Sequence, residues 1–121
     1  MSDSTTITGI DATYYLAKDL VRATAFYRDL LGLTPTMEVP DFVTEFTFPG
    51  GETFGLYNSG EFTPSGGVMF AVPDAKATVE KLKAAGVKFG EDSELSETQV
   101  CYMAFATDTE GNSFIIHQRK G

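Results

Sequence analysis

The 121-residue sequence has little of several residue types, and each shortage excludes a class of protein. Its single cysteine, Cys101, cannot form an internal disulfide, which suits a reducing compartment. No stretch approaches the roughly 18 apolar residues that a membrane-spanning helix needs. Residues 1–9 also lack the basic and apolar parts of a signal peptide. We therefore expect a cytoplasmic protein that does not act at a membrane.

Positive charge is scarce as well. The 9 Lys and Arg residues stand against 17 Asp and Glu residues, which gives a formal net charge of −8. A nucleic-acid partner requires a basic face, so we expect no nucleic-acid binding. The acidity either keeps the protein soluble or attracts cationic small molecules, and charge alone does not decide between these roles.

An internal repeat is the main feature that the sequence does have. In each half a short apolar run leads to an aspartate suited to cap a helix, Asp19 or Asp74. A glycine that can end the helix, Gly32 or Gly86, follows 12 or 13 residues later. Apolar residues at helical spacing between these signals predict that each helix buries one side in a core.

Runs typical of strands follow each helix. We predict strands at 36–39, 42–48 and 53–57 in the first half, and at 87–90, 98–106 and 113–118 in the second. The turn sequences PGG at 49–51 and TEGN at 109–112 join neighbouring strands as hairpins. The predicted fold is α+β, with two tandem β-α-β-β-β modules in one domain: module one at 8–58, a linker at 59–66 and module two at 67–120.

The chain resembles the vicinal-oxygen-chelate superfamily of glyoxalases, bleomycin-resistance proteins, fosfomycin-modifying enzymes and extradiol dioxygenases. The residues that carry the resemblance are KDLVRATAFYRDLLGL at 18–33, VPDAKATVEKLKAAGV at 72–87 and DTEGNSFIIHQRK at 108–120. The last segment is similar to the closing hairpin of the superfamily, with Thr109 and Glu110 in place of Pro and Asp. The resemblance implies curved mixed sheets around a cavity, and commonly a homodimer. It does not imply one function, because this fold hosts both metal enzymes and metal-free binders.

Metal enzymes of this superfamily carry ligands at four strand positions. The resemblance places these positions at Ala12, Gly55, Gly67 and Ile115. None of these side chains is a metal donor, and a metal site needs three or four donors. We therefore expect neither a metal nor another cofactor. A rearranged metal site that combines His117 with Glu45 or Glu52 is the alternative.

Strand alternation predicts which side chains line the cavity. If the four ligand positions point inward, residues two positions away on the same strands do so too. From this alternation the predicted ligand-binding residues are Tyr14, Tyr57, Met69, Ser113 and His117. Glu45 is added because it lies on the face of its strand opposite the phenylalanines, and Met103 because it could contact an aromatic ligand. Pseudo-symmetry between FGLY at 54–57 and FIIH at 114–117 predicts that Tyr57 and His117 lie across the cavity from each other. Phe42, Phe46 and Phe48 are expected in the core.

Two of the polar candidates, His117 and Glu45, have more than one interpretation. His117, the only histidine, is either a hydrogen-bonding wall or general base of a pocket, or a residue that bonds a neighbouring strand or solvent. Glu45 interrupts an apolar strand, where it either contacts a ligand or faces water at a sheet edge. Cys101 has no neighbouring base in the sequence and is expected to be an inert, packed thiol.

The missing metal donors favour a metal-free small-molecule-binding protein with an aromatic-lined cavity. Its ligand would be aromatic or cationic, and the protein a homodimer. The alternative is an enzyme of the same superfamily, of the lyase, isomerase or dioxygenase type. Such an enzyme would use Glu45 and His117 as acid and base, or a rearranged metal site. A dimeric module without chemistry of its own is a further alternative.

Overall fold

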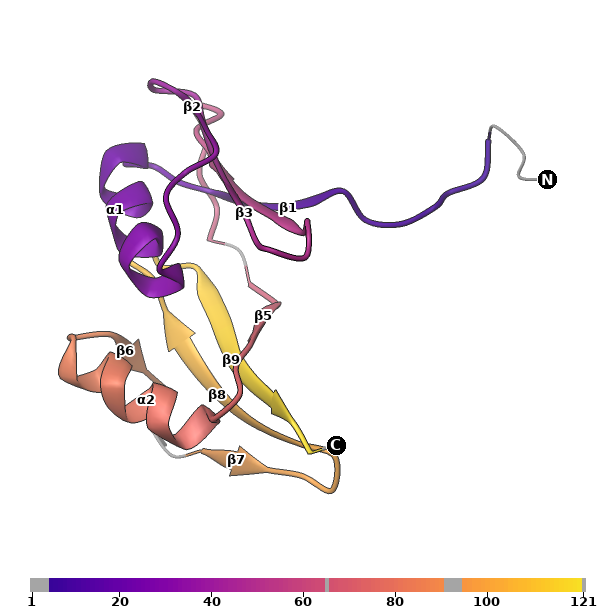
Figure 1. The fold of residues 1–121 in the computed structure, drawn as a ribbon. Helices are drawn as coiled ribbons and strands as arrows, with labels where there is room; N and C mark the ends of the chain where they lie inside the picture. Colours follow the sequence, from indigo (N-terminus) through magenta and orange to yellow (C-terminus); the bar gives the residue numbers. More distant parts are fainter. Residues whose placement is uncertain (1–4, 65, 91–94, 121) are drawn as a thin grey trace.

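The computed structural model describes residues 5–64, 66–90 and 95–120, which form two sheets with one helix each (Figure 1). In sheet one the strand order is β1 (Ala12–Leu16), β4 (Thr53–Tyr57), β3 (Val43–Thr47) and β2 (Met37–Val39). In sheet two the order is β5 (Val68–Ala71), β9 (Ser113–Arg119), β8 (Cys101–Thr107) and β6 (Lys88–Phe89), and β7 (Ser96–Glu97) also pairs with β8.

The two modules have matching topology. Strand β1 runs parallel to β4, and β5 runs parallel to β9, while the remaining strand pairs are antiparallel. The α+β fold with two β-α-β-β-β modules is therefore confirmed, and the sheets do not close into a barrel. In the part of the chain that the structure describes, no helix is long and apolar enough to cross a membrane.

The helices α1 (Leu20–Leu31) and α2 (Ala75–Ala84) begin and end where the sequence predicts. The carboxylate of Asp19 accepts a hydrogen bond from the Arg22 N–H, and that of Asp74 accepts one from the Ala77 N–H, both at 3.0 Å. These bonds satisfy backbone donors that have no partner inside the helix. Gly32 ends α1 in the left-handed conformation, with φ of 67°.

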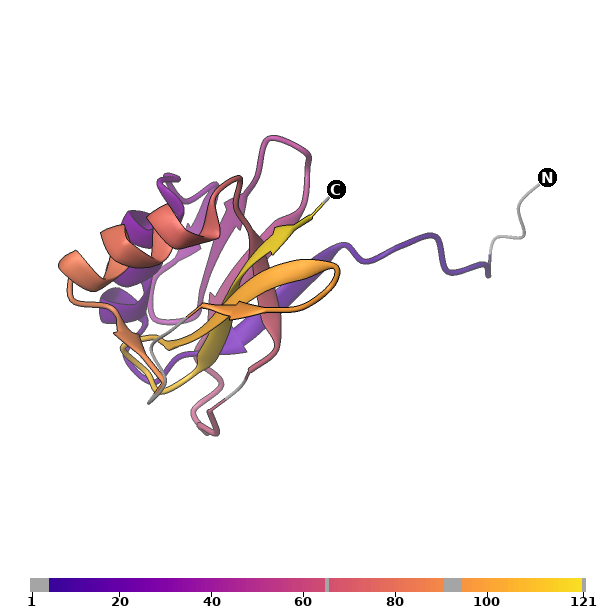
Figure 2. The same ribbon diagram turned by 90° about the horizontal axis from the view of Figure 1, so that it is seen from below.

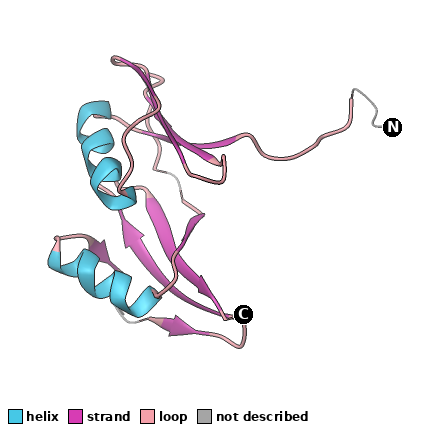
Figure 3. Cartoon of the chain, in the orientation of Figure 1, coloured by secondary structure: helices cyan, strands magenta, loops and turns pink. Residues whose placement is uncertain are grey.

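Both helices lie on the same side of the sheets, as the views in Figures 1, 2 and 3 agree. A single core fills the space between helices and sheets. Its aromatic centre joins both modules and consists of Tyr15, Tyr27, Phe54, Phe70 and Phe114. The sheet surfaces opposite the helices, which we call the open faces, are therefore not covered by either helix.

Tyr15 links the two modules through its hydroxyl group. This group accepts a hydrogen bond from the Val68 N–H at 2.9 Å and donates one to the Ser113 carbonyl at 2.6 Å. Val68 and Ser113 lie at the starts of β5 and β9, so the hydroxyl bridges two strands of sheet two from β1 of sheet one. The contact fixes the position of sheet one relative to sheet two.

Two local predictions were wrong. Phe42 is 55% exposed rather than in the core, because it precedes β3 and follows Asp41, whose φ of 63° interrupts the extended chain. The strand predicted at 98–106 begins only at Cys101, because the Thr98 hydroxyl accepts hydrogen bonds from the N–H groups of Val100 and Cys101. The resulting turn separates β7 from β8.

Candidate functional site

The open face of sheet one has an aromatic surface built around Gly55. The strand register puts Tyr14, Gly55 and Glu45 in one row across β1, β4 and β3. The Tyr14 ring lies over Gly55, because a Cβ atom at Gly55 would be only 2.4 Å from Tyr14 Cε2. The Tyr57 ring meets the Tyr14 ring edge to face, with 6.1 Å between ring centroids.

These side chains are accessible. Tyr14 is 37% exposed, and Glu45 and Tyr57 are half-buried. Their neighbour Tyr15 is 2% exposed and points to the helix side, so the predicted alternation along β1 is confirmed. Two phenol rings and a carboxylate thus lie on one accessible surface that a ligand can contact.

The open face of sheet two is more apolar than that of sheet one and carries two methionines, Met69 and Met103. The register puts Ala71, His117 and Met103 in one row, and Met69, Ile115 and Phe105 in the next. His117 and Met103 are half-buried, whereas Met69 and Phe105 are each 51% exposed. Ser113 lies one row further along β9, opposite Thr107. Large apolar side chains exposed together mark a surface that contacts a ligand or a partner.

The seven predicted site residues therefore divide between the two open faces. The structure brings Tyr14, Glu45 and Tyr57 together on sheet one, and His117 with Met103 on sheet two. The prediction that Tyr57 and His117 lie across one cavity is wrong within a single chain. Because both sheets pack on one core through their helix sides, the two open faces point outward rather than toward each other. Acid–base chemistry by Glu45 and His117 would consequently need a second copy of the chain.

The four positions at which metal enzymes of the superfamily carry ligands do not fit a metal here. Ala12, Gly55, Gly67 and Ile115 offer no donor side chain, and the Tyr14 ring lies over one of them. Within residues 5–64, 66–90 and 95–120, no group of three His, Cys, Asp or Glu side chains could hold a metal ion. Cys101 is buried, and its sulfur lies 3.2 Å from the Thr98 hydroxyl.

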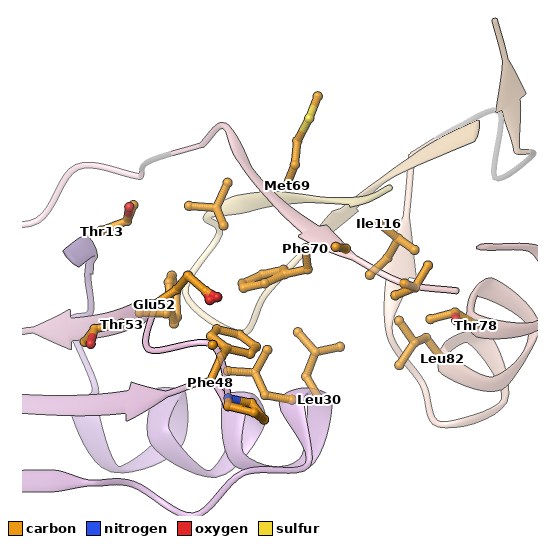
Figure 4. Close-up of a pocket in the computed structure, with 17 residues that line it drawn as sticks. Thr13, Leu30, Phe48, Glu52, Thr53, Met69, Phe70, Thr78, Leu82 and Ile116 are labelled. Atoms are coloured by element: carbon orange, nitrogen blue, oxygen red, sulfur yellow. The ribbon is translucent and has the colours of Figure 1, made fainter. Parts of the chain in front are cut away.

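Sequence reasoning missed a cavity of about 490 Å³ between the two modules (Figure 4). It lies between the β3–β4 turn, strand β5 and helix α2, and Met69 is the only predicted site residue that borders it. Glu52 was considered only as a ligand of a rearranged metal site. The cavity arises from the packing of one module against the other, and no local sequence pattern signals such a space.

The turn between β8 and β9, residues 108–112, which we call the closing turn, also has a structure that its sequence did not reveal. Asp108, Glu110 and Asn112 are buried, although turn residues are usually exposed. The Tyr27 hydroxyl donates a hydrogen bond to Asp108 Oδ2 at 2.6 Å, and burial raises the pKa of Tyr27 far above its ordinary value. Asn112 Nδ2 donates to the Leu16 carbonyl at 2.9 Å. This cluster holds β9 and its open-face residues in place.

Comparison with known proteins places this architecture in a family. The model of the Glyoxalase/Bleomycin resistance protein/Dioxygenase superfamily matches residues 9–116. The chain therefore belongs to this superfamily, and the resemblance noted from the sequence is confirmed. No curated protein matches the chain.

Among solved structures, the chain is similar to a lactoylglutathione lyase from Agrobacterium tumefaciens, with a TM-score of 0.79 and 19% identity over 93% of this chain and 94% of that one. It is similar to TnmS3, an antibiotic binding protein from Streptomyces sp. CB03234, with a TM-score of 0.78 and 18% identity over 94% and 98%. It is also similar to a fosfomycin resistance protein, FosX, from Listeria monocytogenes, with a TM-score of 0.75 and 17% identity over 93% of this chain and 94% of that one. Likeness at these identities shows the fold alone, and the fold does not choose among the functions.

Proposed function

We propose that the protein binds a small molecule without a resident metal, and that the ligand lies over the open face of sheet one. The observation that carries this proposal is the position of the Tyr14 ring over Gly55. Metal enzymes of the superfamily carry a ligand at the Gly55 position. Here an aromatic surface takes the place that a donor side chain would need.

The residues of this face favour a planar aromatic or cationic ligand. Tyr14 and Tyr57 meet edge to face, an arrangement in which ring surface remains available for stacking. A cation over a tyrosine ring is attracted by the negative face of the ring. The carboxylate of Glu45 lies in the same cross-strand row as Tyr14 and adds an opposite charge. The net charge of −8 further attracts cations to the protein.

A second copy of the chain would complete this site. In the proposed homodimer, the open face of sheet one in each chain lies against the open face of sheet two in its partner. Glu45 belongs to the first face and His117 to the second, so the two walls would bring a carboxylate and an imidazole to one site. His117 would then supply a hydrogen-bonding wall, together with Met69, Met103 and Ser113.

Fluorescence titration with proflavine, a planar aromatic cation, tests the proposed site. We expect wild-type protein to bind proflavine, and Tyr14→Ala to weaken binding roughly 3- to 30-fold, which corresponds to about 0.5–2 kcal/mol for a cation–aromatic contact. Glu45→Gln should weaken it by a smaller factor. Glu38→Gln is the matched control, because Glu38 lies on the helix side of sheet one, opposite Thr44.

Two results would contradict the proposal. If Tyr14→Ala bound proflavine with unchanged affinity, the aromatic surface of sheet one would not be the binding site. One equivalent of zinc, nickel, iron or manganese per chain in tag-free protein, measured by elemental analysis, would favour an enzyme with a rearranged metal site. In that case His117→Ala and Glu45→Gln should lower the metal content.

A further inference from the structure

The cavity between the modules, which we call the inter-module cleft, is separate from the aromatic surface of sheet one. Its walls are the β3–β4 turn, strand β5, the end of helix α1 and helix α2. The volume of about 490 Å³ lies within the ~300–1,000 Å³ typical of small-molecule sites, which often form between structural units. The cleft is therefore large enough for a compact organic ligand.

The lining of the cleft is mostly apolar and carries one ionisable group. Large apolar side chains cover its floor and walls: Leu30, Phe48, Phe70, Leu82 and Ile116. Glu52 is the single ionisable group among the described lining residues, and no Lys, Arg or His accompanies it. The carboxylate of Glu52 points into the space between β4 and β5 (Figure 4). Met69 borders the cleft, but its side chain points away from the centre.

The backbone of the β3–β4 turn leaves room for this carboxylate. A Cβ atom at Gly50 would lie 2.4 Å from Glu52 Oε1, so the absence of a side chain at Gly50 permits the position that Glu52 takes. The hydroxyl groups of Thr13 and Thr53 lie at the same end of the cleft. Glu52, Thr13 and Thr53 thus lie at one end of the cleft, while Thr78, whose hydroxyl donates a hydrogen bond to the Asp74 carbonyl, borders the more apolar α2 end.

We propose that the inter-module cleft is a second binding site, and that it takes a small amine with an apolar body and one ammonium group. The apolar body would contact Phe70 and Leu82, while the ammonium group would pair with Glu52. A carboxylate beside an apolar surface favours a cation over a neutral or anionic group of the same shape. This site does not depend on a second copy of the chain.

Isothermal titration with three probes of matched shape tests the proposal. The probes are phenethylamine, 2-phenylethanol and phenylacetate. For wild-type protein we expect the amine to bind more tightly than the alcohol, and the alcohol more tightly than the carboxylate. Glu52→Gln should weaken binding of the amine roughly three- to tenfold, as expected for one partly solvated ion pair, and leave the alcohol unchanged. Glu52 is exposed on a turn, so the variant should fold normally.

The controls separate this site from the surface of sheet one. Glu38→Gln should leave the affinity for the amine unchanged, because Glu38 does not line the cleft. If Tyr14→Ala weakens amine binding and Glu52→Gln does not, the amine occupies the open face and the cleft proposal is wrong. Absence of amine binding at 10 mM, or equal binding of all three probes, also overturns it. If Glu52→Gln instead dissociates a dimer, a second copy of the chain occupies the cleft.

Discussion

Glu110 ties the closing turn to the start of the first helix. Its side chain is 0% exposed and accepts hydrogen bonds from the Asp19 N–H and from Arg22 Nε, both at 2.8 Å. Burial opposes ionisation of this carboxyl group, but the bonds from Arg22 and Asp19 outweigh that effect. The pKa of Glu110 therefore lies below its ordinary value.

Replacing Glu110 with glutamine should lower the free energy of unfolding by about 1–3 kcal/mol at pH 7, since the Asp19 N–H and the Arg22 guanidinium lose a charged acceptor. Because the folded-state pKa is lowered, the stabilisation is complete above the unfolded-state value near ~4.3 and is lost as pH falls through the folded-state pKa. Urea denaturation at pH 7 and pH 3.5 measures this. The difference between wild type and Glu110→Gln should shrink at the lower pH.

Glu80→Gln is the control for this experiment, because Glu80 is exposed on α2. It should change the free energy of unfolding by less than about 0.5 kcal/mol at both pH values. A Glu110→Gln effect of the same size at pH 7 and pH 3.5 would show that the carboxylate charge does not contribute to stability.

Sequence patterns predicted the role of a residue well where the cause was local. Asp19 and Asp74 cap helices because a short side chain reaches backbone N–H groups three residues ahead, and any helix start offers such donors. The burial of Glu110 has a distant cause. Its partners lie 88 and 91 residues away, and no periodicity connects them.

At the scale of elements, the hydroxyl group of Tyr15 completes the hydrogen bonding where β5 and β9 begin. Further along the same pair, the Val72 N–H donates directly to the His117 carbonyl at 2.9 Å. At the start of β5, the Tyr15 hydroxyl stands between the Val68 N–H and the Ser113 carbonyl instead. Burial raises the pKa of this hydroxyl above its ordinary value, so it remains a donor at neutral pH.

Tyr15→Phe should lower the free energy of unfolding by about 1–3 kcal/mol, because two part-buried hydrogen bonds, to Val68 and Ser113, are lost at about 0.5–1.5 kcal/mol each. Tyr57→Phe is the matched control, since Tyr57 is half-buried on the open face, and its effect should stay below about 0.5 kcal/mol. Urea denaturation monitored by circular dichroism measures both. Equal effects of the two variants would contradict a bridging role for the Tyr15 hydroxyl.

Element types and faces could be predicted from the sequence more fully than the arrangement of elements. Alternation predicted that Tyr14 and Tyr15 point to opposite sides of β1, because successive side chains of any strand do so. It could not predict whether the open faces of the two sheets meet within one chain. That depends on how the modules share a core, which in turn rests on contacts such as Tyr15 to Ser113, 98 residues apart.

At the scale of the whole molecule, the open faces leave an unusual amount of apolar surface uncovered. Exposed large side chains lie on both of them: Tyr14, Met37, Val39, Met69 and Phe105. Sheet surfaces of this kind are normally covered by another element or another chain. A symmetric homodimer that pairs the two kinds of open face would cover both at once, because each chain offers one of each.

Phe105→Asp should therefore convert a dimer into a monomer. Phe105 is 51% exposed on the open face of sheet two, so the substitution costs a single chain little stability, but it would bury a charge in the proposed interface. Light scattering at tens of micromolar should give twice the 13.1 kDa chain mass for wild type and the mass of one chain for Phe105→Asp. Val21→Asp is the control, because Val21 is 78% exposed on α1, on the other side of the molecule from the open faces, and should leave the dimer intact. A wild-type protein with the mass of one chain would rule out the dimer and leave Tyr14, Glu45 and Tyr57 without an opposing wall.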